Sequence, residues 1–149
     1  MNHIVIVTEA NETVATGHVM YCIGSSKTLS ETGYAVSFWI NHNAKDSLKN
    51  RIPCIFEEYF ESVECDYAAL VDALQISRPT AVIFNLREIT EGFLHMFRRN
   101  IPADTSVICI DEFGHRNLPA DIIINPMIDP YYWFYDESDA RLFCGAQYL

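Results

Sequence analysis

The sequence predicts an α/β protein built on a doubly wound, Rossmann-like parallel sheet. Short apolar runs rich in β-branched residues alternate along the chain with stretches of helical period. The runs are apolar throughout, which is typical of strands buried on both faces. Polar residues follow most of the runs directly, where the carboxyl ends of parallel strands would meet. Right-handed crossovers between such strands give the doubly wound arrangement.

The first part of the chain predicts three strands and a helix. His3–Thr8 is a β-branched run and forms the first strand. From Gly17 the apolar residues recur at helical spacing, and Gly33 stands where a helix C-cap belongs. Ala35–Ile40 predicts the second strand, and Cys54–Phe56 predicts a short third strand.

The second part continues the alternation. Asp66–Ile76 predicts a helix with Asp66 as its N-cap, and Ala81–Phe84 predicts the fourth strand. Thr90–Asn100 predicts a further helix. Val107–Ile110 and Ile122–Ile124 complete the sheet with a fifth and a sixth strand.

The stretch Asp129–Tyr148 differs from the rest, because it is rich in aromatic residues and shows little period. It is either an aromatic binding surface or a connector whose rings pack against a second domain. We favour the connector, since exposed aromatic patches usually indicate an absent partner. We therefore expect residues 1–149 to form a single domain, the N-terminal one of a two-domain protein whose C-terminal domain is absent.

Composition excludes several classes of protein. The net charge of −10 lacks the basic footprint that a nucleic-acid partner needs, and it also disfavours a self-sufficient binder of nucleotide phosphates. No run approaches the roughly 20 apolar residues of a membrane span, and no signal leader precedes the first strand. The five cysteines are scattered without a CxxC pair, which predicts reduced thiols, a cytoplasmic location and no structural metal site.

The stretch Ala15–Cys22 carries the clearest candidate site. Gly17, at the turn from strand to helix, lets a ligand approach the backbone, and the following helix presents free N–H groups to an anion. His18, in the first turn, is a candidate general base or hydrogen-bond donor. The alternative is an ordinary helix start with a half-buried histidine, and on the residues alone this alternative is the better supported.

Five stretches, in order along the chain, resemble one family. Ala15–Cys22 resembles the G-x-G-H-V-M-R-C segment of the nucleotide-sugar hydrolases of pseudaminic acid biosynthesis and of proteins of spore coat polysaccharide synthesis, in the GT-B glycosyltransferase superfamily. Leu29–Phe38, Ile108–Gly114, Ala120–Pro126 and Phe143–Leu149 resemble further segments of the same family.

The resemblance implies the N-terminal half of a GT-B fold, whose C-terminal domain holds most of the nucleotide. It implies a nucleotide-sugar substrate, UDP-linked, that is transferred or hydrolysed at the anomeric C–O bond without a metal or cofactor, in surface polysaccharide or sialic-acid-like sugar biosynthesis. His18 would be the catalytic base. The residues expected to bind the substrate are Thr16, Gly17, Val19, Asn85 and Asp111. Asp111 has the alternative role of holding a loop.

The chain departs from the family pattern at three positions. Ala15 replaces a glycine, Tyr21 replaces an arginine, and Asn85 replaces an aspartate at the end of the fourth strand, with Arg87 nearby as a substitute charge. These departures indicate a different substrate, altered chemistry or lost activity. The competing hypothesis is therefore a non-catalytic sugar-binding or partner-docking module, and a structural domain without a site is a third. The sequence makes no prediction of oligomeric state.

Overall fold

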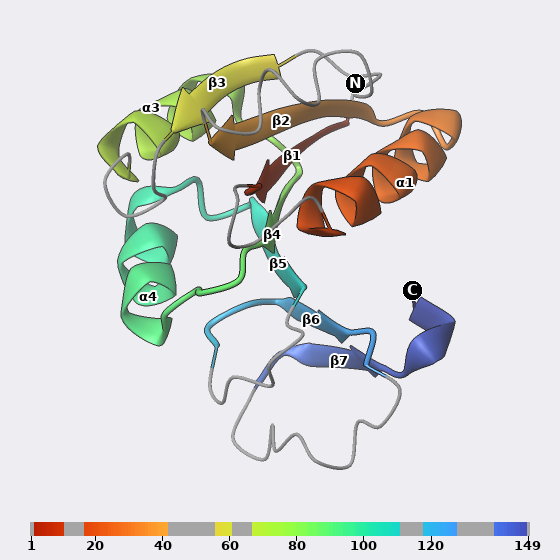
Figure 1. Ribbon diagram of the computed structural model, residues 1–149. Helices are drawn as coiled ribbons and strands as arrows, with labels where there is room; N and C mark the ends of the chain where they lie inside the picture. The colour runs from red at the N-terminus through yellow and green to blue at the C-terminus, as the bar shows by residue number, and fades with distance from the viewer. Residues whose placement is uncertain are drawn as a thin grey trace.

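A computed structural model describes residues 2–10, 17–41, 56–60, 67–110, 118–127 and 139–148. Its elements, in chain order, are β1 (His3–Thr8), α1 (Gly17–Glu31), β2 (Ala35–Asn41), β3 (Phe56–Phe60), α3 (Tyr67–Ser77), β4 (Ala81–Asn85), α4 (Glu91–Asn100), β5 (Ser106–Ile110), β6 (Ile122–Asn125), β7 (Arg141–Cys144) and the 3-10 turn η2 (Ala146–Tyr148). The strands form one seven-stranded sheet in the order β3-β2-β1-β4-β5-β6-β7 (Figure 1). Every neighbouring pair is parallel, so the predicted Rossmann-like α/β fold is confirmed.

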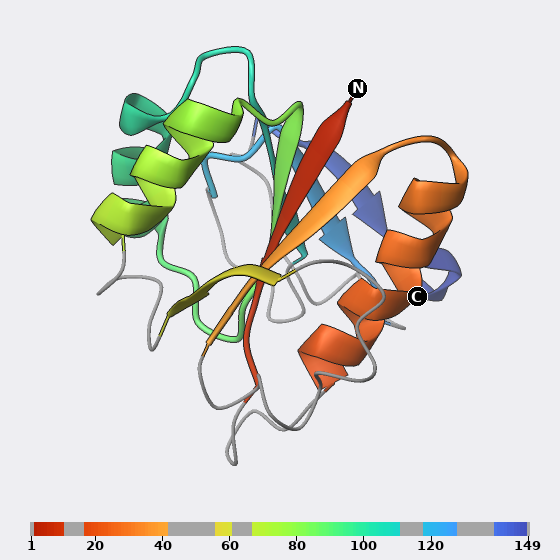
Figure 2. The same ribbon diagram turned by 90° about the horizontal axis from the view of Figure 1, so that it is seen from above.

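The sheet buries apolar side chains on both of its faces. Along β1, Ile4 and Ile6 pack against α1, while Val5 and Val7 pack toward α3 and α4. This alternation follows from the period of two in a strand. Figure 2 shows α1 on one side of the sheet and α3 with α4 on the other. The arrangement is therefore doubly wound, as the continuous apolar runs predicted.

The helix α4 agrees closely with its sequence signals. Thr90 is the N-cap, and its Oγ1 accepts a hydrogen bond from the backbone N–H of Phe93 at 3.1 Å. The rings of Phe93 and Phe97 lie buried against the sheet, and Phe97 meets Phe84 of β4 edge to face at 4.9 Å between centroids. These contacts fix α4 over β4 and leave the opposite face of that strand to α1.

Two strands differ from the sequence prediction. The strand β3 covers Phe56–Phe60, later than the predicted Cys54–Phe56, whose first two residues lie outside the described part of the chain. The strand β7 falls inside the stretch that we expected to lack regular structure. It has four residues and pairs only with β6, so its sequence is too short and too exposed to show a period. The aromatic run Tyr131–Tyr135 lies outside the described residues.

Two composition-based expectations can be compared with the described residues. In that part of the chain no helix has the length and apolar character that crossing a bilayer requires. The side chains of Cys22 and Cys109 are buried, as predicted, and that of Cys144 is half-buried. Cys54 and Cys65 lie outside the described residues.

One ion pair ties α4 to the β5–β6 side of the sheet. Arg98 binds both carboxylate oxygens of Asp121, at 2.7 and 2.8 Å, and Asp121 also accepts the backbone N–H of Val107 at 2.7 Å. Burial alone would raise the pKa of Asp121. The hydrogen bonds from Arg98 and Val107, with the charge of Arg98, outweigh burial and hold that pKa below its usual value.

We expect Asp121→Asn to lower the free energy of unfolding by about 1 kcal/mol at pH 7. Because the folded-state pKa is depressed, this stabilisation is present above the ordinary aspartate pKa of about 3.9 and is lost as the pH falls through the folded value. Urea unfolding of both proteins from pH 7 to pH 3 measures the difference, which should shrink toward acid. Asp104→Asn is the control, since its contact with Arg78 is 4.0 Å long and highly exposed. An equal effect of both substitutions, or one independent of pH, would contradict the assignment.

Candidate functional site

The candidate site lies where the carboxyl ends of β1 and β4 meet the first turn of α1. Thr8 and Asn85 are the last residues of these strands and are direct partners in the parallel register. Both continue the alternating row that faces α1, which begins at Gly17. Parallel strands that are distant in sequence therefore place Thr8, Asn85 and His18 at one edge of the sheet (Figure 1).

His18 is hydrogen-bonded to Asn85 by an interaction that determines its tautomer. The Nδ1 atom lies 2.7 Å from Oδ1 of Asn85. The amide Nδ2 of Asn85 donates to the backbone oxygen of His18 at 3.2 Å and to Sγ of Cys22 at 3.4 Å. This pattern orients the amide, so its oxygen faces the ring. Because a carbonyl oxygen only accepts, Nδ1 must carry the hydrogen.

The remaining ring nitrogen of His18 is the atom available for chemistry. With Nδ1 protonated, Nε2 of the neutral ring holds a lone pair, and no hydrogen bond joins it to a described residue. The side chain of Asn85 is fully buried, whereas His18 keeps 9% of its surface exposed. The arrangement therefore presents a fixed imidazole whose Nε2 can accept a proton.

Thr8 contributes a buried polar atom without a partner. Among the buried side-chain nitrogens and oxygens of the described residues, Thr8 Oγ1 lacks a hydrogen bond. A buried hydroxyl left unpaired costs about 1–3 kcal/mol, and such atoms in folded proteins call for a physical explanation. The hydroxyl of Thr8, beside Asn85, could therefore form a hydrogen bond with a ligand at this edge of the sheet.

The other predicted site residues fall into three groups. Gly17 is exposed, and a Cβ built on it would meet no atom of the described residues within 4 Å. Val19, expected to bind substrate, is instead fully buried in the core under α1, because one helical step turns its side chain to the sheet. Thr16 and Asp111 lie outside the described residues.

Tyr21, one of the departures from the family pattern, and Arg87, the nearby substitute charge, both form hydrogen bonds. Tyr21 donates its hydroxyl to the backbone oxygen of Tyr148 at 2.7 Å and so connects α1 to the 3-10 turn. The backbone N–H of Arg87 donates to the carboxylate of Glu9 at 2.7 Å, which joins the segments that follow β4 and β1. Glu9 thereby places a negative charge at the edge of the site.

Sequence reasoning missed two members of the polar cluster, which consists of Thr8, His18, Cys22 and Asn85. The two missed members are Thr8 and Cys22. Cys22 follows His18 by four residues, a spacing that puts both on one face of the helix, so this signal was present in the sequence. Thr8 was recognised only as the end of a strand. Its place beside Asn85 follows from the strand register, which the sequence does not state.

Comparison with known proteins assigns no family to the chain. No protein-family model matches the sequence, and no curated protein matches it. Within the described ranges, no group of three or more His, Cys, Asp or Glu side chains is placed to hold a metal ion. The chemical assignment of the site therefore comes from the geometry of His18 and its partners.

We expect nitrogen NMR of the labelled protein to show His18 in the Nδ1–H tautomer when the ring is neutral. His95 is an internal reference, because its Nε2 lies 3.4 Å from the carboxylate of Glu91, a contact that favours the opposite tautomer. Asn85→Ala should remove the tautomer preference of His18. It should also destabilise the fold by about 1–3 kcal/mol, since the Nδ1–H of His18 loses its acceptor. An Nε2–H tautomer at His18 in the unsubstituted protein would refute the assignment.

Proposed function

We propose that the chain is the N-terminal, GT-B-type half of a protein that acts on a nucleotide-activated sugar, with His18 as the general base. The observation that carries the proposal is the Nδ1–Asn85 hydrogen bond at 2.7 Å, which leaves Nε2 to accept a proton. The strand order and the exposed position of Gly17 support it, because ligands of doubly wound sheets bind beyond the carboxyl ends of the strands. The proposed setting is surface polysaccharide or sialic-acid-like sugar biosynthesis.

The proposed reaction is a displacement at the anomeric carbon. Nε2 of His18 removes the proton of a water molecule or of an acceptor hydroxyl, whose oxygen forms a bond to the anomeric carbon. The bond from that carbon to the nucleoside diphosphate breaks, and the diphosphate leaves with the electron pair. The base must lie about 2.6–3.2 Å from the oxygen that it deprotonates. Asn85 holds the imidazole in the required tautomer during this step.

The nucleotide itself is proposed to be held mainly by a second, C-terminal domain. The N-terminus of α1 offers free N–H groups and the positive end of a helix dipole to a phosphate. The acidic chain, at net charge −10, favours a division of labour in which another domain supplies most of the phosphate contacts. The UDP-linked substrate is part of the same proposal.

A non-catalytic sugar-binding or docking module is the second candidate, and Tyr21 favours it. This residue stands where the resembling family has an arginine, and its hydroxyl is committed to the backbone of Tyr148. It therefore carries no charge for a diphosphate. Such a module would keep the fold and the His18 cluster and would bind a sugar without turnover.

We expect His18→Gln in the full-length protein to lower kcat by 10² or more for whichever nucleotide sugar the unsubstituted protein turns over. KM should change only a few-fold, because glutamine keeps a polar side chain at this position but cannot act as a base. Release of free nucleotide from a panel of UDP-linked and other nucleotide sugars measures the rate. His95→Gln, on the exposed side of α4, is the matched control and should retain full activity.

The two candidates give different results in this experiment. An unchanged kcat in His18→Gln would remove His18 from the reaction. Saturable binding of a sugar ligand without turnover by the unsubstituted protein would replace the enzyme with the binding module.

A further inference from the structure

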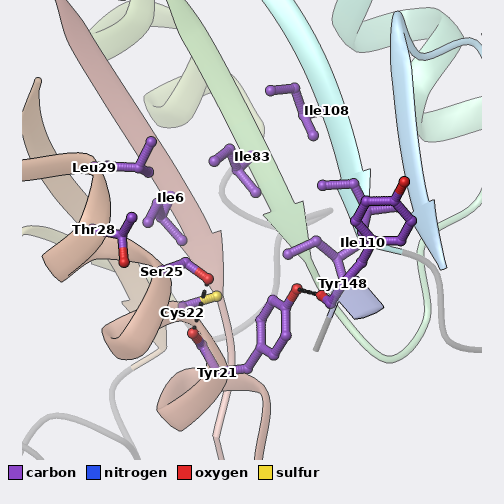
Figure 3. Close-up of a pocket in the computed structure, with 11 residues that line it drawn as sticks. Ile6, Tyr21, Cys22, Ser25, Thr28, Leu29, Ile83, Ile108, Ile110 and Tyr148 are labelled. Carbon is purple, nitrogen blue, oxygen red and sulfur yellow. Dashed lines mark hydrogen bonds between the residues drawn. The ribbon is translucent and has the colours of Figure 1, made fainter. Parts of the chain in front are cut away.

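A cavity of about 410 Å³ lies between α1 and the neighbouring face of the sheet, and Cys22 lies at its border with the polar cluster around His18. One wall is the side of α1 that faces the sheet, and the floor is a row of isoleucines from β1, β4, β5 and β6 (Figure 3). The lining residues are Ile6, Tyr21, Cys22, Ser25, Thr28, Leu29, Ile83, Ile108, Ile110, Ile124 and Tyr148.

The cavity exists because α1 covers only part of its face of the sheet. This helix packs on β1, β2 and β4. On this face of β4, β5 and β6, the floor residues Ile83, Ile108 and Ile124 are only half buried. The opposite face of the same strands is closed by α3 and α4, with Val82, Val107 and similar side chains fully buried. Parallel sheets are normally covered on both faces. The half-buried side chains of Ile83, Ile108 and Ile124 therefore favour an apolar occupant.

The chemistry of the lining selects an uncharged occupant. None of the described lining residues carries a charge. The hydroxyl of Tyr21 is used by the backbone of Tyr148 at 2.7 Å, and that of Ser25 by the backbone of Tyr21 at 3.1 Å. A phosphate or a carboxylate would be desolvated here without an oppositely charged partner among the described lining residues, which costs several kcal/mol.

The shape of the cavity favours a compact molecule over a helix of another protein. The Tyr21–Tyr148 hydrogen bond joins α1 to the 3-10 turn and closes one end, as Figure 3 shows. The ring of Tyr148 is braced by Phe143 at 5.5 Å between centroids. A volume of about 410 Å³ lies within the roughly 300–1,000 Å³ that is usual for small-molecule pockets.

The floor is broad in both directions. From β1 to β6 it crosses three strand spacings, about 14 Å, and from Tyr21 to Leu29 it follows α1 for about 12 Å. A flat ring system contacts such a floor more fully than a single extended chain does. We infer that this cavity is a binding site for an uncharged, ring-containing, largely hydrocarbon molecule. The site is separate from the proposed nucleotide-sugar reaction and does not depend on it.

The direct test is a fluorescence titration with N-phenyl-1-naphthylamine, an uncharged aromatic probe. We expect saturable binding at one site with a Kd in the micromolar range, and at least tenfold weaker binding of the anionic probe anilinonaphthalene sulfonate. Ile108→Trp should fill the cavity and weaken binding of the neutral probe more than tenfold. Ile76→Trp, the same substitution at a site 85% exposed on α3, is the matched control and should bind normally.

A measurement on the unsubstituted protein covers the case in which Ile108→Trp fails to fold. Titration of methyl-labelled isoleucines with the neutral probe should shift the signals of the cavity isoleucines and leave Ile76 unchanged; the cavity isoleucines are Ile6, Ile83, Ile108, Ile110 and Ile124. Non-saturable binding, equal affinity for both probes, or shifts elsewhere would overturn the inference. A dimer that forms with rising concentration, buries these methyls and excludes the probe would overturn it in favour of a second copy of the chain. Since His18→Gln should leave probe binding intact, failure here is distinct from failure of the proposed function.

Discussion

The parallel pairing of β1 with β4 is the contact on which the other features depend. It joins two segments that are distant in sequence at the centre of the sheet, where the strand order changes direction. From β1 the chain builds outward through α1 to β2, and from β4 it builds the other way through α4 to β5. Because every crossover is expected to have the same hand, these opposite directions put the helices on opposite faces. The same pairing aligns Thr8 with Asn85 and so creates the edge at which His18 sits.

The two faces of the sheet are covered to different extents. On one face α3 and α4 supply large apolar side chains, and the rings of Phe84, Phe93 and Phe97 form edge-to-face and stacked contacts. On the other face α1 covers the sheet only as far as β4. The hydroxyl of Tyr21 then reaches across to the backbone of Tyr148 instead of to a ligand. Both residues of this contact line the apolar cavity that α1 leaves on this face.

Local sequence signals predicted most of the elements but few of the contacts. The bounds of β1 agree to the residue, and those of α4 agree to within one residue, because continuous apolar runs and helical spacing are local signals. The strand β7 was missed, since a four-residue edge strand shows no period. The sequence identified His18 but not its bond to Asn85, which depends on the register between distant strands. The side chain of Val19 points into the core instead of beside that of His18, because a helix turns successive side chains by about 100°.

Asn85 stands where the resembling family has an aspartate. In the proposed function it can still support a base at His18. An amide oxygen accepts the Nδ1 hydrogen at 2.7 Å and fixes the ring, as a carboxylate would. It does so without adding a negative charge, and Glu9 already places one at this edge, in a chain of net charge −10. A carboxylate at position 85 would repel the diphosphate of the proposed substrate at close range. In the proposed function, an asparagine in place of an aspartate thus keeps the geometry of the base and lowers the negative charge that an anionic substrate would meet at this edge.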